Sequence, residues 1–551
     1  MNPSPHASRF VSGLPFRGNP VLSIAARGRL LKKTVTIFLF APTLLFAQSV
    51  NLPLWHWAYP FFDRMETRGL LFDVRSGSRP FTRQKAAKLV LRLDKARSAN
   101  PAAFSRVESQ YIERLKGEFY DELHDSAVTI RHSEREPHLY SYEKEGDALH
   151  ADAVVGGKVT LRSKDAEPSE RRVIGPYYGV LLRGSVSGIG AYSDNRIFAE
   201  WGTRKYIQEY RASRGYPRNA EKDSSRATWD MSDSYLVFPL KGFSIEFGRD
   251  NLQWGRSFVA GLFLSGLAPS MDMLKFSAAL GGAEFSWAYA ELRSDFQRKW
   301  LSAHRLEFSA ARGVDIGLNE AVVYGNRGLE AAYANPIMPY LVAQHSLGNR
   351  DNLVMGFDAS IRRIKNLRLY GEAFIDDLFA PWDIFDDYWG NRLAFMLGGH
   401  WVDPLGLGNT DVRMEYVRIE PFVYSHDDSV NVFEHYASGL GHFLLPNSDG
   451  WFAEAKTRFE IWFQTAIRLE RTRHGRGDRR TPHRESDGDR KQFLDGTVET
   501  RTRFSLVFET QPVRDAFVRC EIGRMLSRNY GNEPGINRTW VEAIISADWN
   551  W

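Results

Sequence analysis

Residues 539–551 alternate between apolar and polar positions. The apolar positions are Val541, Ala543, Ile545, Ala547, Trp549 and Trp551, and the polar ones are Glu542, Ser546, Asp548 and Asn550. A period of two predicts a β-strand with one apolar and one polar face. A strand of this kind that ends in tryptophan is typical of a transmembrane barrel, whose apolar face meets lipid. A soluble sheet stays open as the alternative on this stretch alone.

The same alternation recurs along the chain from about residue 138. It predicts strands near 138–146, 152–164, 174–186, 188–203, 233–240, 241–249, 272–280, 283–294, 300–311, 313–325, 352–363, 366–377, 392–402, 409–420, 451–461, 463–474, 496–509, 513–526 and 538–551. This gives 18 or 19 segments, and an even number is expected of a bacterial barrel. We therefore predict an all-β barrel of about 18 antiparallel strands over residues 138–551.

The connections between these strands mostly alternate between short and long. Short ones fall near 281, 312, 365, 405, 462 and 511, and long ones span about 250–271, 326–351, 378–391, 421–450 and 475–495. Tight periplasmic turns and long outer loops are typical of outer-membrane barrels. If the last strand ends in the periplasm, every long loop lies outside the cell.

The sequence before the strands predicts two further regions. Residues 1–47 resemble a signal peptide, with a basic stretch before an apolar run of about 13 residues; a membrane anchor is the alternative. Residues 48–125 predict three helices, and Thr82 is a good N-cap for the second. We expect a small helical bundle on the periplasmic side. The pattern from Trp57 to Ala87 also resembles a degenerate S-layer-homology helix pair, so a cell-wall contact is the alternative role.

Charge and cysteine content narrow the class of protein. The net charge of +5 comes from six basic residues in 1–47; without them, 66 basic residues face 67 acidic ones, a net charge of −1. The basic balance is therefore no argument for a nucleic-acid partner. The single cysteine, Cys520, excludes an internal disulfide.

Arginines alternate with acids on the polar strand faces, which favours a filled lumen with paired charges; a water-filled porin wall is the alternative.

Several segments resemble the capsule assembly Wzi family of outer-membrane proteins. The residues that carry the resemblance are Leu54-Trp55-His56-Trp57, Gly69-Leu70, Arg79-Pro80, 248–255 (G-R-D-N-L-Q-W-G), 374–377 (F-I-D-D), Glu415-Tyr416, 424–426 (Y-S-H), 440–442 (L-G-H) and 445–447 (L-P-N). The family usually has a small residue or proline after its Trp-Gly pair, whereas Arg256 follows here. The resemblance implies an 18-stranded barrel, a periplasmic helical bundle and a non-enzymatic, lectin-like role in holding capsular or related polysaccharide.

Loop residues supply the chemistry that a polysaccharide needs. Aromatic faces pack on sugar rings, and carboxylates, amides, arginines and imidazoles bond to hydroxyl groups or acidic sugars. The candidate ligands are Arg249, Asp250, Trp254, Arg256, Asp376, Asp377, Trp382, Trp389, His426, His442 and Asn447. Loop packing is the alternative role for the aromatic residues, and a structural turn is the alternative for the Asp pair. The run 473–490, rich in Arg and Asp, predicts a solvated loop, with attraction to anionic polysaccharide or lipopolysaccharide as the alternative.

The motifs of common hydrolases and phosphate-binding loops are absent from the sequence, so we expect no catalytic residues and no enzyme. No cofactor or metal site is predicted either. The expected location is the outer membrane, and the expected partners are polysaccharide, outer-membrane lipid, lipopolysaccharide and the barrel assembly machinery, which would read Trp549 and Trp551. We expect a monomer. A porin or transporter is the competing function.

Overall fold

The computed structural model describes residues 50–123, 130, 135–144, 146–163, 172–202, 221–222, 226–294, 298–379, 384 and 386–550. All of them belong to one compact unit, Leu45–Trp551. The predicted signal peptide, Trp382 and Trp551 lie outside these ranges. Among the helices in the described ranges, none has the length and apolar character needed to cross a membrane.

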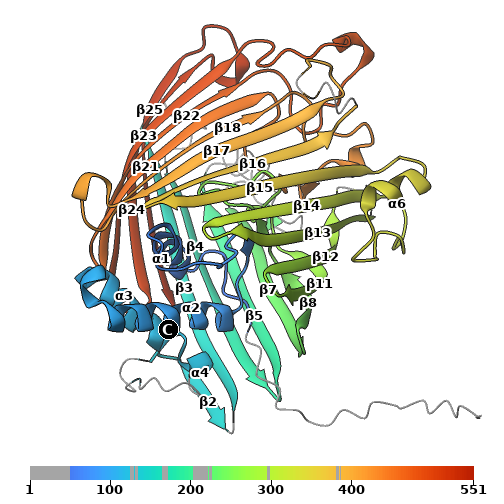
Figure 1. The fold of residues 1–551 in the computed structure, drawn as a ribbon. Helices are drawn as coiled ribbons and strands as arrows, with labels where there is room; N and C mark the ends of the chain where they lie inside the picture. The colour runs from blue at the N-terminus through green and yellow to red at the C-terminus, as the bar shows by residue number, and fades with distance from the viewer. Residues whose placement is uncertain are drawn as a thin grey trace, which may run out of the picture. The chain divides into compact units, whose positions relative to one another are not determined.

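Within the described residues, eighteen strands form a closed antiparallel barrel (Figure 1). They are β3 (Asp147–Arg162), β4 (Arg172–Val186), β5 (Ile189–Trp201), β7 (Arg226–Leu240), β8 (Phe243–Asp250), β11 (Met271–Leu280), β12 (Ala283–Arg293), β13 (Arg298–Ala311), β14 (Val314–Gly325), β15 (Asn352–Ile364), β16 (Leu367–Asp377), β17 (Arg392–Val402), β18 (Thr410–Ile419), β21 (Ser448–Glu460), β22 (Phe463–His474), β23 (Glu499–Val513), β24 (Ala516–Arg528) and β25 (Arg538–Asn550). The last strand, β25, pairs with β3 and closes the barrel.

The extra predicted segment near 138–146 is not a barrel strand. Its core, β2 (Tyr140–Lys144), forms a hairpin with the first residues of β3. A second short piece, β6 (Glu221–Lys222), pairs with β7. The predicted barrel strands otherwise agree with the observed ones within a few residues, except that β7 begins seven residues earlier, at Arg226.

The two ends of the barrel differ as the connection lengths predict. Short connections such as 241–242, 312–313 and 461–462 share one end, called here the turn end. The backbone N–H of Asn550 donates to Asp515 in another short connection, so β25 also finishes at the turn end. The long connections occupy the opposite end, called the loop end.

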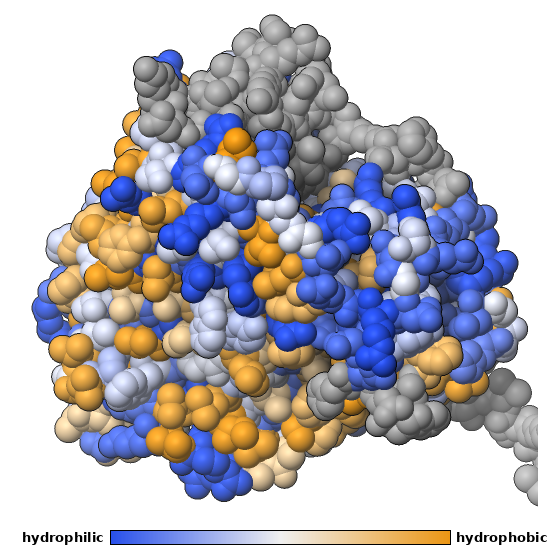
Figure 2. Space-filling view, turned by 90° about the horizontal axis from the view of Figure 1, so that it is seen from above, coloured by the Kyte–Doolittle hydropathy of each residue, from blue (hydrophilic) through white to orange (hydrophobic). Residues whose placement is uncertain are grey.

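Strand β25 has the two faces that its alternation predicts. Val541, Ile545 and Trp549 are exposed on the outer wall, whereas Glu542 pairs with Arg162 and with Arg503 inside the barrel. Apolar residues are exposed on most other strands as well. Figure 2 shows one face of the molecule, where hydrophobic residues recur over much of the surface and hydrophilic ones gather on one side. An apolar exterior around a charged interior is the arrangement of a membrane barrel.

The predicted N-terminal helices are present and share a hydrophobic core. They are α1 (Ala58–Thr67), α2 (Arg83–Ala99), α3 (Arg106–Glu118) and α4 (Tyr120–Leu123). Thr82 caps α2 by accepting a hydrogen bond from the backbone N–H of Lys85, as predicted. Ser105 and Glu108 form a capping box at the start of α3. The caps satisfy N–H groups that a helix leaves unpaired in its first turn.

The helices are tied to the turn end by charge pairs. Arg64 on α1 lies 2.9 Å from Glu108, 2.9 Å from Asp411 and 2.7 Å from Asp403, which joins α3, β18 and the β17–β18 turn. The Arg64 side chain is almost fully buried, and a buried guanidinium is stable only when its charge and N–H groups are matched. Asp403 and Asp411 therefore fix the position of α1 inside the barrel.

We predict that Arg64→Met loosens the helices from the barrel. The substitution leaves Asp403 without its cation and takes one cation each from Glu108 and Asp411, which keep Arg68 and Arg458. Breaking a buried charge pair costs at most about 3–5 kcal/mol, and the retained cations lower this cost. The variant should unfold at a lower temperature and lose residues 50–123 to protease under conditions where the parent chain is resistant. The matched control is Arg106→Met, because Arg106 on α3 makes an exposed pair with Glu460 that should contribute less than about 1 kcal/mol. Equal effects of the two substitutions would contradict the assignment.

Candidate functional site

The long connection 251–270, called here the in-folded segment, turns into the barrel rather than out of it. Two short strands of this segment, β9 (Gln253–Trp254) and β10 (Leu264–Ser265), pair with each other, and β9 also pairs with β1 (Ser78–Arg79). The Trp254 ring stacks on Phe263, and its side chain is 1% exposed. The in-folded segment and the N-terminal region together fill part of the lumen.

Two carboxylates of the wall hold the backbone of the in-folded segment. Glu372 on β16 accepts hydrogen bonds from the N–H groups of Arg256 at 2.6 Å, Ser257 at 3.1 Å and Leu262 at 2.8 Å. Glu415 on β18 accepts from the N–H of Phe258 at 2.5 Å. Charged acceptors form strong hydrogen bonds with backbone N–H groups, so the barrel wall supplies the partners that water would supply to an outer loop.

The side chain of Arg256 lies in a buried charge network. It contacts Glu307 and donates to the Ser76 hydroxyl at 2.7 Å. Arg305 pairs with Asp358 in the same network, and its Nε donates to Ser78 at 2.8 Å. The network joins the in-folded segment, the N-terminal region and the wall strands β13 and β15. In this network the arginines and acids of the lumen are paired, as their alternation along the strands predicts.

A cavity of about 1220 Å³ remains inside the barrel beside the in-folded segment. Tyr177 on β4, Phe198 on β5 and Trp229 on β7 line it as a row of rings, called here the aromatic row. The ring centroids of Tyr177 and Phe198 are 4.9 Å apart, and those of Phe198 and Trp229 are 5.6 Å apart with nearly parallel planes. The three positions are directly opposite one another across the strand pairs, so the sheet register aligns them.

Polar side chains surround the aromatic row. Glu200, Asp233 and Asp548 line the same cavity, and the Tyr177 hydroxyl donates to Asp548. A flat apolar platform beside hydrogen-bonding carboxylates can bind a sugar ring on one face and its hydroxyl groups at the edge. Sequence reasoning missed the aromatic row because its rings are separated by 21 and 31 positions along the chain. The available signal was the presence of aromatic residues on the inward face of each of three successive strands, with Tyr192 and Tyr235 in addition to the row itself.

Six predicted ligands contribute to the packing of the interior. Trp254 and Arg256 belong to the in-folded segment, and Asp250 accepts a hydrogen bond from the Asn51 amide at 2.7 Å. Asp376 accepts from the N–H of Tyr424, and Asn447 bonds to backbone groups of Arg476 and Leu494. The sixth, His442, is fully buried. In this conformation these side chains offer little surface to a ligand.

The other described candidates keep accessible surface near the loop end. They are Arg249, Asp377, Trp389 and His426. Arg249 forms a bidentate pair with Asp272 at 2.7 Å, on the face of β8 opposite to that of Asp250. Trp389 stacks on His483 at 3.8 Å, with the Arg392 guanidinium 5.1 Å from its centroid. Of these ten residues, Arg249 and Asp250 line the lumen cavity, and the structure does not bring the other eight together with them in one cleft.

The Arg- and Asp-rich loop is not simply a solvated loop. Its backbone pairs with the acidic loop after β16, because the N–H of Trp389 donates to Asp489 and the N–H of Lys491 donates to Asp387. The ammonium group of Lys491 also lies 2.6 Å from Glu420. The charges of the acidic loop and of the Arg- and Asp-rich loop therefore partly balance each other at the loop end.

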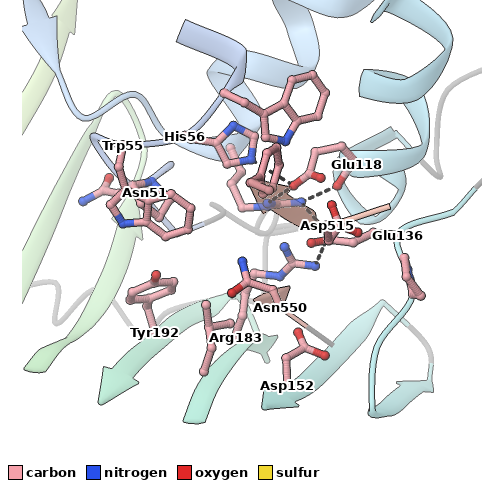
Figure 3. A pocket seen from close by; sticks show the side chains of 16 residues that line it. Asn51, Trp55, His56, Glu118, Glu136, Asp152, Arg183, Tyr192, Asp515 and Asn550 are labelled. Atoms are coloured by element: carbon pink, nitrogen blue, oxygen red, sulfur yellow. Dashed lines mark hydrogen bonds and ion pairs between the residues drawn. The ribbon is translucent and has the colours of Figure 1, made fainter. Parts of the chain in front are cut away.

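A second cluster of ionisable groups lies at the turn end. His150 on β3 donates to the Asp121 carboxylate at 2.9 Å, and together with Glu143 these residues have ligand atoms within 4.8 Å of one another. Burial would raise the pKa of Asp121, but the bond to His150 and the charge of Arg183 hold this pKa below its usual range. Figure 3 shows the adjacent pocket, where Arg183 points toward Glu136, at 2.9 Å. Because arginine already balances these acids, we assign no metal to the cluster.

The model of the family described as capsule assembly protein Wzi matches residues 176–530. A solved structure described as Wzi, a carbohydrate-binding β-barrel of the Escherichia coli outer membrane involved in group 1 capsule assembly, is 11% identical; the match covers 91% of this chain and 99% of that one, with a TM-score of 0.57. OprD from Pseudomonas aeruginosa is 9% identical, with 73% and 94% coverage and a TM-score of 0.41. Among curated proteins, no match was found.

We predict that Glu372→Ala releases the in-folded segment. Three backbone N–H groups would lose a charged acceptor, and each buried N–H left unpaired costs about 1–3 kcal/mol. Release should widen the path through the lumen, so single-channel recordings in planar bilayers should show larger or more frequent conductance steps than the parent chain. The control is Glu509→Ala, because the Glu509 carboxylate binds side chains of the wall, among them Lys456 and Arg519. Identical recordings for both variants and the parent would refute this role of Glu372.

We predict that the loop between β18 and β21 loosens as the pH falls below about 6.5. Burial lowers the pKa of His442 to about 3, so the folded loop holds a neutral imidazole while the unfolded chain takes up a proton. The neutral His442 therefore contributes its full stabilisation of the folded loop above the pKa of a histidine in the unfolded chain, about 6.5. This contribution falls by about 1.4 kcal/mol per pH unit between pH 6.5 and pH 3. Proteolysis of this loop should be faster at pH 5 than at pH 7.5. Nδ1 of His442 accepts from the N–H of Leu444 at 3.1 Å, so His442→Asn keeps an acceptor and should reduce the pH dependence. The same dependence in both proteins would exclude His442 as its source.

Proposed function

This chain belongs to the capsule assembly protein Wzi family, and from that premise we propose that it binds surface polysaccharide and holds it at the bacterial outer membrane. The observation that carries the proposal is the aromatic row in the large lumen cavity. Tyr177 and Phe198 keep accessible surface, and beside the buried Trp229 they form a platform on which a sugar ring can pack. The neighbouring carboxylates can accept hydrogen bonds from sugar hydroxyl groups.

The proposed orientation places the turn end in the periplasm and the loop end at the cell surface. Short turns on one side and long loops on the other support it. The helices then occlude the barrel from the periplasmic side, and the glycan enters from outside. In this proposal Arg249, Asp377, Trp389 and His426 contact the polysaccharide near the loop end. The cavity holds a terminal part of the polysaccharide.

The interior supports a binding protein over a porin or transporter. The in-folded segment is bonded to the wall through Glu372 and Glu415, and the helices are bonded to the turns through Arg64. Moving either one aside would break charge-assisted hydrogen bonds, so a steady open pore is unfavourable. We further propose a non-enzymatic role, in which the glycan is retained without being cleaved.

We predict that Phe198→Ala weakens glycan binding about tenfold, which corresponds to about 1.4 kcal/mol. The substitution removes the central ring of the aromatic row, so a sugar loses one stacking face and the platform is interrupted. Binding of the purified full chain to polysaccharide extracted from the source cells would be measured by calorimetry. The matched control is Ile197→Ala on the same strand, because Ile197 is exposed on the opposite face.

Barrel assembly provides the second readout. Both variants should migrate like the parent chain before and after heating in a denaturing gel, because neither side chain closes the barrel. Unchanged affinity for Phe198→Ala in a correctly assembled barrel would remove the aromatic row from the proposed site. Absence of binding by the parent chain would instead reject the proposed function.

A further inference from the structure

The long connection 326–351 packs on the outer wall of the barrel, and is called here the covering segment. It includes the short helix α6 (Tyr340–Ser346), which lies beside β14 in Figure 1. The wall residues beneath it include Trp287 and Tyr289 on β12, and Val322 and Tyr324 on β14. Their strand neighbours on the opposite face, such as Ala288, Ala290, Ala321 and Val323, belong to the lumen core with Trp254. The covering segment therefore occupies the side of the wall that faces away from the lumen.

Hydrogen bonds fix the covering segment to this wall. The Trp287 indole N–H donates to the Tyr340 hydroxyl at 3.0 Å, and the Ser302 hydroxyl donates to the Tyr333 carbonyl at 2.7 Å. Glu320 on β14 accepts from the N–H groups of Tyr340 and Leu341, both at 3.0 Å. Polar groups on the outer wall of a membrane barrel are costly when they face lipid alone. The covering segment supplies partners to these groups.

The exposed surface of the covering segment carries apolar residues among polar ones such as Asn335, His345 and Arg350. Its exposed apolar residues are Leu329, Ile337, Leu341 and Val342, and Ile337 is 81% exposed. A contiguous exposed apolar patch marks an interaction surface. The wall already occupies the other side of the segment, so the barrel itself does not cover these residues.

Strand β14 shows what lies next to this patch. Along its outer face Tyr324 and Val322 are fully buried under the covering segment, Glu320 caps α6, and Leu318 is 44% exposed. Leu318 is only two positions from Glu320, which is about 7 Å along a strand. Leu318 belongs to the apolar outer wall, together with its cross-strand neighbour Phe357. Because Glu320 also accepts from the N–H of Leu341, the part of the patch at Leu341 lies beside the wall surface that meets lipid.

We propose that the covering segment is a membrane-surface element whose exposed apolar residues insert among the lipids of the leaflet at the loop end. Apolar side chains gain free energy by leaving water at the boundary between headgroups and acyl chains. Lipid is favoured over a second copy of this chain because the patch lies beside the lipid-facing wall at Leu341. The segment thus widens the membrane footprint on the side of β12–β15 and shields polar wall groups from acyl chains. The contact of the covering segment with lipid is independent of glycan binding.

Fluorescent labels test the position of the patch in the full-length barrel. The natural thiol is removed by Cys520→Ala, and single cysteines are placed by Val342→Cys, Leu318→Cys and Ser486→Cys. Leu318 is the control for a lipid-facing position, and Ser486, exposed in the loop between β22 and β23, is the control for an aqueous position. Each variant is reconstituted in vesicles of phosphatidylethanolamine and phosphatidylglycerol, with or without lipids brominated on their acyl chains.

The expected result is that brominated lipid quenches the label at Val342 within about twofold of its effect at Leu318. Iodide in the aqueous phase should quench Val342 several-fold less than Ser486. Quenching of Val342 by iodide to the extent seen at Ser486 would overturn the proposal, because the patch would then lie in water. Protection from both quenchers, with pyrene excimers that increase with protein density, would also overturn it and identify a second copy as the occupant.

Discussion

The pairing of charges inside the barrel is the constraint on which the rest of the structure depends. A membrane barrel turns every second side chain inward, and in this chain many of those side chains are arginines and carboxylates. Glu307, Asp358 and Glu372 are buried, so each needs a cation or several N–H donors. The in-folded segment and the N-terminal region supply such partners through the Arg256 guanidinium, backbone N–H groups and the Ser78 hydroxyl, which donates to Glu307 at 2.6 Å. Filling the lumen is therefore a consequence of the wall's own charge.

This constraint also explains how the helices are held. Their apolar side chains form a core of their own, as the sequence periodicity indicates, but their attachment to the barrel is largely ionic. Arg64 binds Asp403 and Asp411, Lys85 binds Glu284, and Arg114 binds Asp515. These carboxylates lie in or beside the turns. Carboxylates at the turn end thus bind basic residues of the N-terminal helices and position these helices.

The strands were predictable because a barrel wall obeys a local rule, whereas the site was not. Alternation along each strand predicts which residues face inward and which face outward. The lengths of the connections predict which strand ends lie at the same end of the barrel. The observed bounds of β25 and its neighbours therefore agree with the predicted ones. Whether a loop leaves the barrel or enters it depends on partners far away along the chain. Trp254 and Arg256 carry the residue types of a glycan site, yet their partners include Phe263, Ser76 and Glu307. The aromatic row forms only through the register of β4, β5 and β7.

The two long connections 251–270 and 326–351 show what decides the direction of a loop. The first contains Arg256 and many small residues, and the lumen offers Glu372, Glu415 and Glu307 as acceptors for its charge and its backbone. The second contains Tyr333, Tyr340 and an apolar surface, and the outer wall offers Trp287, Tyr289 and Ser302. Each connection packs where the wall satisfies its polar groups and buries its rings. The pattern of inward and outward residues on β12–β18 therefore specifies the loops as well as the strands. It places an apolar surface at the membrane, and inside the barrel it combines the apolar core around Trp254 with the charged groups that hold the in-folded segment.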